Sequence, residues 1–198
     1  MSAPAKQPER ETTAQRATVV AANLFAAHGY TETSTRELAK ALGVTKGTFY
    51  HHFLSKEALL VQICDESLTR ITSAALEADN EAGNPLSRLE ALIRGHVNTM
   101  LADQALHKTM LTELRSLTAD NYDRVLGLRD TYSAILRDAI KTCQADGVLS
   151  AGVDPHLLTL LLLNLLNWTI FWYQPSGEHT PSEIADATVT TFLDGWQV

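Results

Sequence analysis

The stretch Thr33-Ser-Thr-Arg-Glu-Leu-Ala-Lys-Ala-Leu-Gly-Val-Thr-Lys-Gly-Thr-Phe-Tyr-His-His-Phe-Leu-Ser-Lys56 decides the fold of the N-terminal part of the chain. Apolar residues recur at helical spacing from Leu38 to Leu42, after an N-cap at Ser34 or at the residue before it. Gly43 ends this first helix, and Thr45 can cap a second one that starts directly afterwards. Two short helices joined by a tight turn that contains glycine predict a helix-turn-helix unit.

The second of these helices, residues 46–51, carries the side chains that such a unit presents to DNA. Its first turn is small, polar or basic, as the major groove requires, whereas Phe49 and Phe53 are expected to turn inward and hold the helix in place. Hydroxyl, imidazole and ammonium groups follow, and they suit phosphates, which set register without reading sequence. Arg36, in the preceding helix, could reach a guanine edge or a phosphate. The pattern therefore predicts a unit that reads double-stranded DNA.

The residues of Thr33–Leu59 and of the preceding Ala22–Tyr30 closely resemble the tetracycline-repressor (TetR) family of bacterial regulators. This resemblance implies a three-helix DNA-binding domain and a larger helical domain that forms a homodimer and binds a small ligand. Ten residues fall where members of that family contact DNA: Thr35, Arg36, Thr45, Lys46, Gly47, Thr48, Tyr50, His51, His52 and Lys56. For the two capping threonines, helix capping alone is an equal alternative, and for Tyr50 and His51 the alternative is ordinary surface packing.

The composition agrees with a helical chain that binds DNA at one end. Few glycines and prolines (10 and 6 of 198 residues) and 45% hydrophobic residues favour helices around a sizeable core. The net charge of -7 alone argues against nucleic acid, but the charge is unevenly distributed. Residues 1–60 hold seven Lys or Arg against five acids, which leaves nine bases and eighteen acids for residues 61–198. The acidic remainder would repel phosphates and orient the N-terminal end towards DNA.

Helical periodicity and cap signals predict an all-α fold of about nine helices, with no competing strand pattern. Residues 1–11 are expected to be a disordered arm and residues 12–58 the helix-turn-helix DNA-binding domain. Residues 59–198 are expected to form the ligand-binding and dimerisation domain. Within this larger domain a single helix is expected over residues 106–117 and a long one over residues 121–145.

The residues from Leu157 to Gly177 form an uncharged stretch of 21 positions, which is long enough to span a bilayer. Amide side chains and Pro175 interrupt it, and no Lys or Arg flanks it closely, which favours a helix buried in protein instead. Because this helix is apolar nearly all round, a monomer would leave one of its faces in water. A dimer would cover that face. The resemblance implies that this helix and the last one, from Thr180, form the homodimer interface, with the helix over residues 121–145 as a further candidate.

Candidate effector contacts lie on the middle helices and on the aromatic part of the uncharged stretch. They are Met100, Met110, Arg115, Tyr122, Asn164, Trp168, Phe171 and Trp172. Packing of core and interface is the alternative for these residues, and an apolar pocket with a few polar groups is the functional interpretation. The segment Asn167–Gly177 resembles relatives that sense acyl-coenzyme A thioesters, although these more often carry a basic residue where Gln174 stands. The resemblance implies an acyl-CoA effector. A cationic drug is the alternative, and it needs a buried acid that this stretch lacks.

Other kinds of chemistry find little support in the sequence. Cys64 and Cys143 fit free cytosolic thiols rather than a disulfide scaffold, and no apolar segment for export begins the chain, so a cytoplasmic protein is expected. The histidines are too scattered for a metal site, and no nucleophile motif or phosphate loop indicates an enzyme or a bound cofactor.

The chain is interpreted as a repressor that leaves a palindromic operator when a small hydrophobic effector binds. An enzyme or an interaction module built on the helical bundle is the remaining alternative.

Overall fold

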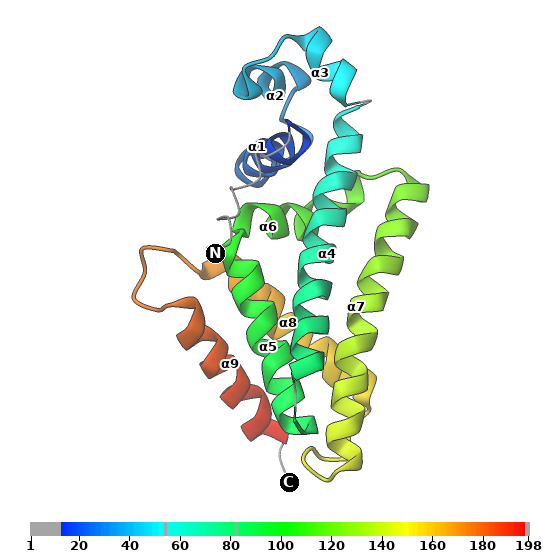
Figure 1. The fold of residues 1–198 in the computed structure, drawn as a ribbon, viewed down its shortest axis with the longest axis vertical. Coiled ribbons are helices and arrows are strands. Elements are labelled where there is room, and N and C mark those ends of the chain that lie inside the picture. The colour runs from blue at the N-terminus through cyan, green and yellow to red at the C-terminus, as the bar shows by residue number, and fades with distance from the viewer. Residues whose placement is uncertain (1–12, 54, 82, 197–198) are drawn as a thin grey trace, which may run out of the picture.

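The computed structural model of the protein describes residues 13–53, 55–81 and 83–196, and these are all-α (Figure 1). Along these ranges the chain forms nine α-helices and one 3-10 turn: α1 (Thr13–His28), α2 (Thr35–Leu42), α3 (Lys46–His52), α4 (Lys56–Glu81), α5 (Pro85–Ala102), α6 (Gln104–Thr112), η1 (Leu114–Ser116), α7 (Ala119–Ala145), α8 (Pro155–Trp172) and α9 (Pro181–Trp196). The predicted fold class, all-α with an N-terminal helix-turn-helix, is confirmed. The predicted arm over residues 1–11 lies outside the described residues.

The helix-turn-helix forms through the local signals that predicted it. Ser34 accepts the Glu37 N–H at 3.2 Å, and the Glu37 carboxylate accepts the Ser34 N–H at 2.7 Å, so the two residues form a capping box at the start of α2. Gly43 then takes a φ of +70°, in the left-handed region that favours glycine. Thr45 caps α3 by accepting the Thr48 N–H at 3.1 Å. All of these contacts are close in sequence, which is why the pattern alone predicts them.

Two apolar cores follow one another along the long axis, and α4 runs through both (Figure 1). The N-terminal core combines α1, α2 and α3 with Leu59 and Ile63 of α4, and it also takes in Leu106 of α6 and Val125 of α7. The C-terminal core joins α5, α7, α8 and α9 around the second half of α4. The N-terminal core therefore continues past residue 58, where the sequence suggests that the DNA-binding domain ends.

Residues 106–117 do not form the single helix expected of them, because α6 ends early and η1 follows. This interruption turns Leu114 into the N-terminal core, where it is 7% exposed. The carboxylate of Glu57, at the start of α4, then accepts the Thr118 N–H at 2.8 Å, the Thr118 hydroxyl at 2.7 Å and the Asn121 amide at 2.9 Å. These hydrogen bonds connect the start of α7 with the start of α4, the helix that follows the helix-turn-helix in the chain.

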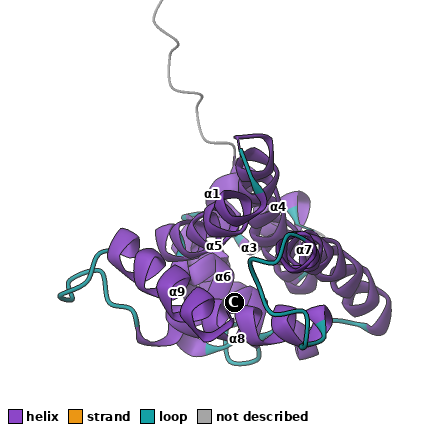
Figure 2. Ribbon diagram, turned by 90° about the horizontal axis from the view of Figure 1, so that it is seen from below, coloured by secondary structure: helices purple, strands orange, loops and turns teal. Residues whose placement is uncertain are grey.

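Among the described residues, α8 is the one helix whose length and hydropathy would allow it to cross a membrane. About a third of it is buried, and its neighbours in the fold are mainly α5 and α7. Its other face leaves seven large apolar side chains exposed: Leu157, Leu160, Leu161, Leu165, Trp168, Phe171 and Trp172. Figure 2 shows α8 on the side of the molecule away from α1 and α4. This chain therefore leaves one apolar face of α8 uncovered.

Candidate functional site

α2 and α3 form one end of the molecule along its long axis (Figure 1). On α3, Phe49 is fully buried and Phe53 is 7% exposed, with ring centroids 5.4 Å apart, as the sequence predicts for the inward side. The residues 45–48, together with Tyr50 and His51, are exposed. The buried rings thus fix α3 while its polar face points into solvent, which is the arrangement that a reading helix requires.

Several predicted DNA contacts lie together on this face. The Tyr50 hydroxyl donates to Thr35 Oγ1 at 3.4 Å, which joins α3 to the start of α2. Lys46 Nζ lies 5.9 Å from the centroid of the Tyr50 ring, and the hydroxyls of Thr45 and Thr48 are 2.9 Å apart. The two helices therefore present hydroxyl, aromatic and ammonium groups side by side, and this combination suits phosphates and base edges.

The sequence predicts that the Lys56 ammonium contacts a DNA phosphate, but in the structure most of its donors bind groups of the protein itself. Its Nζ donates to the carbonyl oxygens of Tyr30 at 2.8 Å and Thr33 at 3.0 Å, and it lies 4.1 Å from the centroid of the Tyr30 ring. Two of the three ammonium donors therefore hold the loop between α1 and α2 against the start of α4. A phosphate contact through the third donor stays a prediction. His52 belongs to α3, but its side chain lies outside the described part of the structure.

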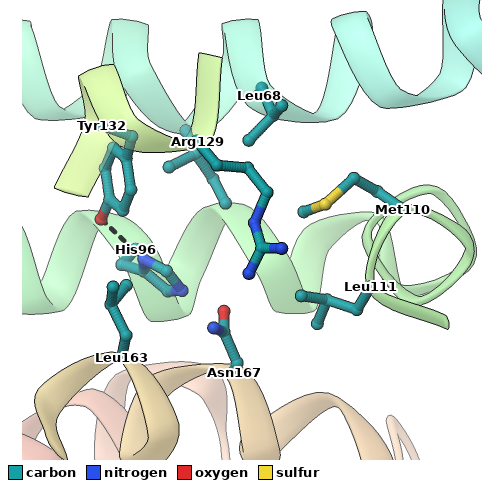
Figure 3. Close-up of a pocket in the computed structure, with 9 residues that line it drawn as sticks. Leu68, His96, Met110, Leu111, Arg129, Tyr132, Leu163 and Asn167 are labelled. Atoms are coloured by element: carbon teal, nitrogen blue, oxygen red, sulfur yellow. Dashed lines mark hydrogen bonds between the residues drawn. The ribbon is translucent and has the colours of Figure 1, made fainter. Parts of the chain in front are cut away.

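A cavity opens inside the larger part of the molecule, between α4, α5, α6, α7 and α8 (Figure 3). The space inside it together with the open solvent at its mouth amounts to about 350 Å³. Nine side chains line it: Leu68, Ile71, His96, Met110, Leu111, Arg129, Tyr132, Leu163 and Asn167. Five of these are apolar and four carry polar groups that converge on the same space. This composition is typical of a site for a small organic molecule.

His96 and Tyr132 form a buried polar pair at one wall of the cavity, with His96 Nδ1 2.6 Å from the Tyr132 hydroxyl. Burial raises the pKa of Tyr132, so the hydroxyl keeps its proton. Because His96 Nδ1 is the one acceptor found for this proton among the described residues, we assign the Tyr132 O–H as the donor to Nδ1. Burial, and to a smaller extent His107, lowers the pKa of His96 to about 3, so the ring is neutral and its proton sits on Nε2. The Asn167 side chain faces Nε2 and partly raises the pKa of His96 again. However, His96 Nε2 has no hydrogen-bond partner of normal geometry. His96 therefore offers an N–H donor to a ligand.

Arg129 of α7 reaches into the middle of the cavity, and Figure 3 shows its guanidinium between Met110 and Asn167. The side chain is partly buried, and no carboxylate of the described residues forms an ion pair with it. A guanidinium carries five donors and no acceptor. The site therefore combines a positive charge with a neutral N–H donor in a mainly apolar space.

A second buried histidine lies close to this site. His107 of α6 is fully buried, and its Nδ1 lies 2.7 Å from the Ser67 hydroxyl. Burial lowers the pKa of His107 to about 4, although Asp103 raises it. Among the residues that the structure describes, no group of three or more His, Cys, Asp or Glu side chains could hold a metal ion. His96 and His107 are thus two neutral imidazoles inside the helical bundle.

One of the eight residues predicted to contact an effector, Met110, lines this cavity. Met100 is fully buried in the C-terminal core, Tyr122 packs against the N-terminal core, and Arg115 is exposed on η1. The other four lie on the exposed side of α8: Asn164, Trp168, Phe171 and Trp172. Trp172 also lines a surface hollow beside α9. The aromatic side chains of α8 therefore point away from the cavity.

The sequence interpretation missed three of the four polar residues of the cavity, His96, Arg129 and Tyr132. For His96 a signal was present, because it is a polar residue within the apolar face of α5. Arg129 and Tyr132 are three positions apart, so they share one face of α7. Nothing in the spacing shows that this face meets α5.

Comparisons with known proteins cover both sites. Residues 18–63 match the family model for bacterial regulatory proteins of the tetR family, and residues 82–196 match the model for the tetracyclin repressor-like C-terminal domain. The chain is 26% identical over 181 residues to the HTH-type transcriptional repressor KstR2 of Rhodococcus jostii, which covers 89% of this chain and 87% of that protein.

Solved structures give the same result over the whole fold. The TetR family regulator PfmR from Thermus thermophilus superposes with a TM-score of 0.84 at 33% identity, over 90% of this chain and 97% of that one. AibR, in complex with isovaleryl coenzyme A and operator DNA, superposes with a TM-score of 0.79 at 27% identity, over 91% and 97% of the two chains. The chain therefore belongs to the TetR family of transcriptional regulators, the family that its helix-turn-helix resembles.

Proposed function

We propose that the protein is a homodimeric repressor that leaves its operator when a small effector fills the cavity of Figure 3. The observation that carries this proposal is that one chain holds both an exposed polar face on α3 and a cavity with converging polar groups. Family membership supports DNA-binding regulation in general. Repression is supported by the likeness to KstR2, which is named a repressor, and ligand response by the likeness to AibR.

An acyl-CoA thioester is the effector class supported by the likeness to AibR, which was solved with isovaleryl coenzyme A. The enclosed part of the cavity is small, because its space of about 350 Å³ includes open solvent at the mouth. It suits an acyl group rather than a whole thioester, so the coenzyme part would lie at the mouth. Gln174, which the sequence offers in place of a basic residue, is exposed just after α8 and supplies no positive charge there.

A second copy of the chain is the partner we propose for the exposed face of α8. Trp168 is 65% exposed and Trp172 is 50% exposed in the single chain, and such an apolar patch marks an interaction surface. Trp172, Leu165 and Ile184 line a hollow between α8 and α9 that a side chain of the second copy can fill. A two-fold pairing through α8 and α9 gives a dimer with two α3 helices, which suits a palindromic operator.

Two contacts connect the cavity with the DNA-reading end. Thr109 of α6 donates to the Ala22 carbonyl of α1 at 3.1 Å in a buried contact, and the next residue of α6, Met110, lines the cavity. The Glu57 carboxylate ties α4 to the start of α7, the helix that carries Arg129. A ligand that favours a shifted position of α6 or α7 therefore also favours a shifted helix-turn-helix, which lowers operator affinity by population shift.

The double variant Lys46→Ala, Tyr50→Ala tests the DNA-reading face. We expect it to bind the operator at least about a hundredfold more weakly than the wild type, because a phosphate or base contact is lost from both side chains. The operator is first selected from genomic fragments with the wild-type protein, and affinities are then measured by gel shift at fixed salt. Lys141→Ala, which removes an exposed charge from α7, is the matched control. Undiminished operator binding by the double variant would refute this assignment of the reading face.

Gly47 gives a finer test of how closely DNA approaches α3. A Cβ atom at this position would meet only the Thr45 hydroxyl oxygen, at an ordinary 3.8 Å, so the fold does not require glycine here. Alanine is the better helix former by about 1 kcal/mol. Gly47→Ala is therefore expected to keep or raise the melting temperature while it weakens operator binding about tenfold through a steric clash with DNA. Thermal unfolding and gel shift measure the two effects separately. Unchanged operator affinity would mean that DNA leaves room at Gly47.

A further inference from the structure

We infer that the effector carries a carboxylate, which pairs with Arg129 and accepts the Nε2–H of His96, while its apolar body lies against the leucine and methionine side chains of the cavity. This inference rests on the proposed function, because it names the chemical class of the molecule that fills the same site. It goes beyond that function in choosing one class among neutral, cationic and anionic ligands.

The unpaired charge of Arg129 is the first observation behind this choice. A cation in a partly buried, mainly apolar space is costly unless an anion accompanies it. The nearest acids pair with other cations: Asp65 of α4 with Arg124 through one of its two oxygens, and Asp103, between α5 and α6, with Arg70 at 3.0 Å. Among the described residues, no carboxylate lies within ion-pair distance of Arg129, and a ligand with a negative charge would supply one.

The direction of the hydrogen-bonding groups is the second, independent observation. His96 is 2% exposed, its Nδ1 is taken by the Tyr132 hydroxyl, and its Nε2 has no hydrogen-bond partner and faces the cavity. Since Arg129 also only donates, the two strongest polar groups of the wall both require an acceptor. A purely apolar ligand would leave both donors unsatisfied, and a cation would be repelled by Arg129. A carboxylate offers two acceptor oxygens that match the fork of a guanidinium.

The rest of the lining limits what the carboxylate is attached to. Leu68, Ile71, Leu111 and Leu163 supply apolar walls, and the flexible Met110 side chain can adapt to an irregular body. A phosphate would bring up to two negative charges against the single cation of this wall, so a carboxylate on an apolar skeleton fits better. Such a group can come from a free organic acid or from a thioester whose acyl chain ends in a carboxylate.

The test compares pairs of molecules that differ in this one group. Calorimetry on the wild-type protein without DNA measures octanoate against octanamide and phenylacetate against phenylacetamide, which keep the skeleton and remove the charge. Adipoyl-CoA against hexanoyl-CoA makes the same comparison for the thioester source. We expect the carboxylate member of at least one pair to bind more than about tenfold more tightly than its uncharged partner. The pair that shows this difference identifies the source.

Variants then locate the effect. Arg129→Gln is expected to lower carboxylate affinity by about 10- to 100-fold and to leave the weak binding of the amide unchanged. Its melting temperature should stay the same or rise, because a partly buried, unpaired charge is removed. Arg129→Lys should recover part of the affinity, since it restores the charge without the fork. Lys141→Gln, an exposed loss of charge on the same helix, should change nothing.

Equal binding of acid and uncharged partner, unchanged carboxylate affinity in Arg129→Gln, or no binding of any acid tested would each overturn the inference. These failures are separate from a failure of the proposed function. If the wild type binds its operator and a neutral molecule releases it from wild type and Arg129→Gln alike, the regulatory function stands and the carboxylate does not. If acids bind through Arg129 but leave the operator complex intact, the carboxylate stands and the release step does not.

Discussion

Leu161→Asp together with Trp168→Asp is expected to convert the proposed dimer into monomers and to raise its dissociation constant by at least about a thousandfold. The two side chains are 42% and 65% exposed in the single chain, on the uncovered face of α8. In a two-fold interface each position occurs twice, so the double variant places four carboxylates in an apolar contact. Sedimentation velocity over a range of concentrations measures the change. Because both positions are exposed in the monomer, the variant should fold normally, and its circular dichroism spectrum should match that of the wild type.

A matched control separates the loss of this interface from the general effect of surface charge. Leu76→Asp makes the same exchange at a leucine that is 51% exposed on α4, and the dimer should remain. The monomeric double variant should also lose most of its operator affinity, because one helix-turn-helix then binds without its mate. Dimers that persist in the double variant would place the interface elsewhere. If the wild type floats with lipid vesicles, the face of α8 binds a membrane and the dimer proposal is wrong.

The helix-turn-helix could be predicted residue by residue because its determinants are local. The Ser34–Glu37 capping box, the left-handed Gly43 and the Thr45 cap each act within a few positions, and the structure contains all three. Both ends of α2 and the start of α3 are each fixed by a residue type with one physical reason to be there. The break after α6 could not be predicted in this way. It depends on Leu114 entering a core built from helices far away in the sequence.

The cavity of Figure 3 could not be predicted from the sequence, for the same reason. Its polar residues come from α5, α7 and α8, and periodicity gives the face of a helix but not the helix that it meets. α8 is the extreme case, since it is apolar nearly all round and its pattern cannot tell the inner face from the outer one. Asn164 and Asn167 looked equivalent in the sequence, yet Asn164 is exposed and Asn167 lines the cavity. Whether each asparagine faces solvent or the cavity is decided by the three-dimensional contacts of α8, not by the residue type.

The second large effect expected is a steep loss of stability in mild acid, caused by His96 and His107. Burial lowers their pKa values from the ordinary 6.5 to about 3 and about 4. Between pH 6.5 and these pKa values the two histidines are protonated in the unfolded chain but not in the folded chain. The free energy of unfolding therefore falls as the pH is lowered. Each histidine contributes a slope of about 1.4 kcal/mol per pH unit. Together they remove on the order of 4 kcal/mol between about pH 6.5 and 4.5, because the slope is smaller near both ends of this range. This is a large part of the stability of an ordinary domain.

Urea unfolding of His96→Asn and His107→Asn at several pH values, with the protomer concentration held fixed, isolates the two contributions. Asparagine keeps an acceptor for the Tyr132 or Ser67 hydroxyl but cannot be protonated, so each variant should lose about half of the acid slope. Its packing cost is the same at every pH and cancels in the slope. His156→Asn, at an exposed position, controls for the loss of a histidine as such. The measurement stays above pH 4.5, because carboxylates such as Glu57, whose pKa is lowered by hydrogen bonds from Asn121 and Thr118, lose their stabilising effect below it. An acid slope that is unchanged in both variants would mean that the two rings are protonated in the folded protein, and the N–H donor assigned to His96 would then need to be reassigned.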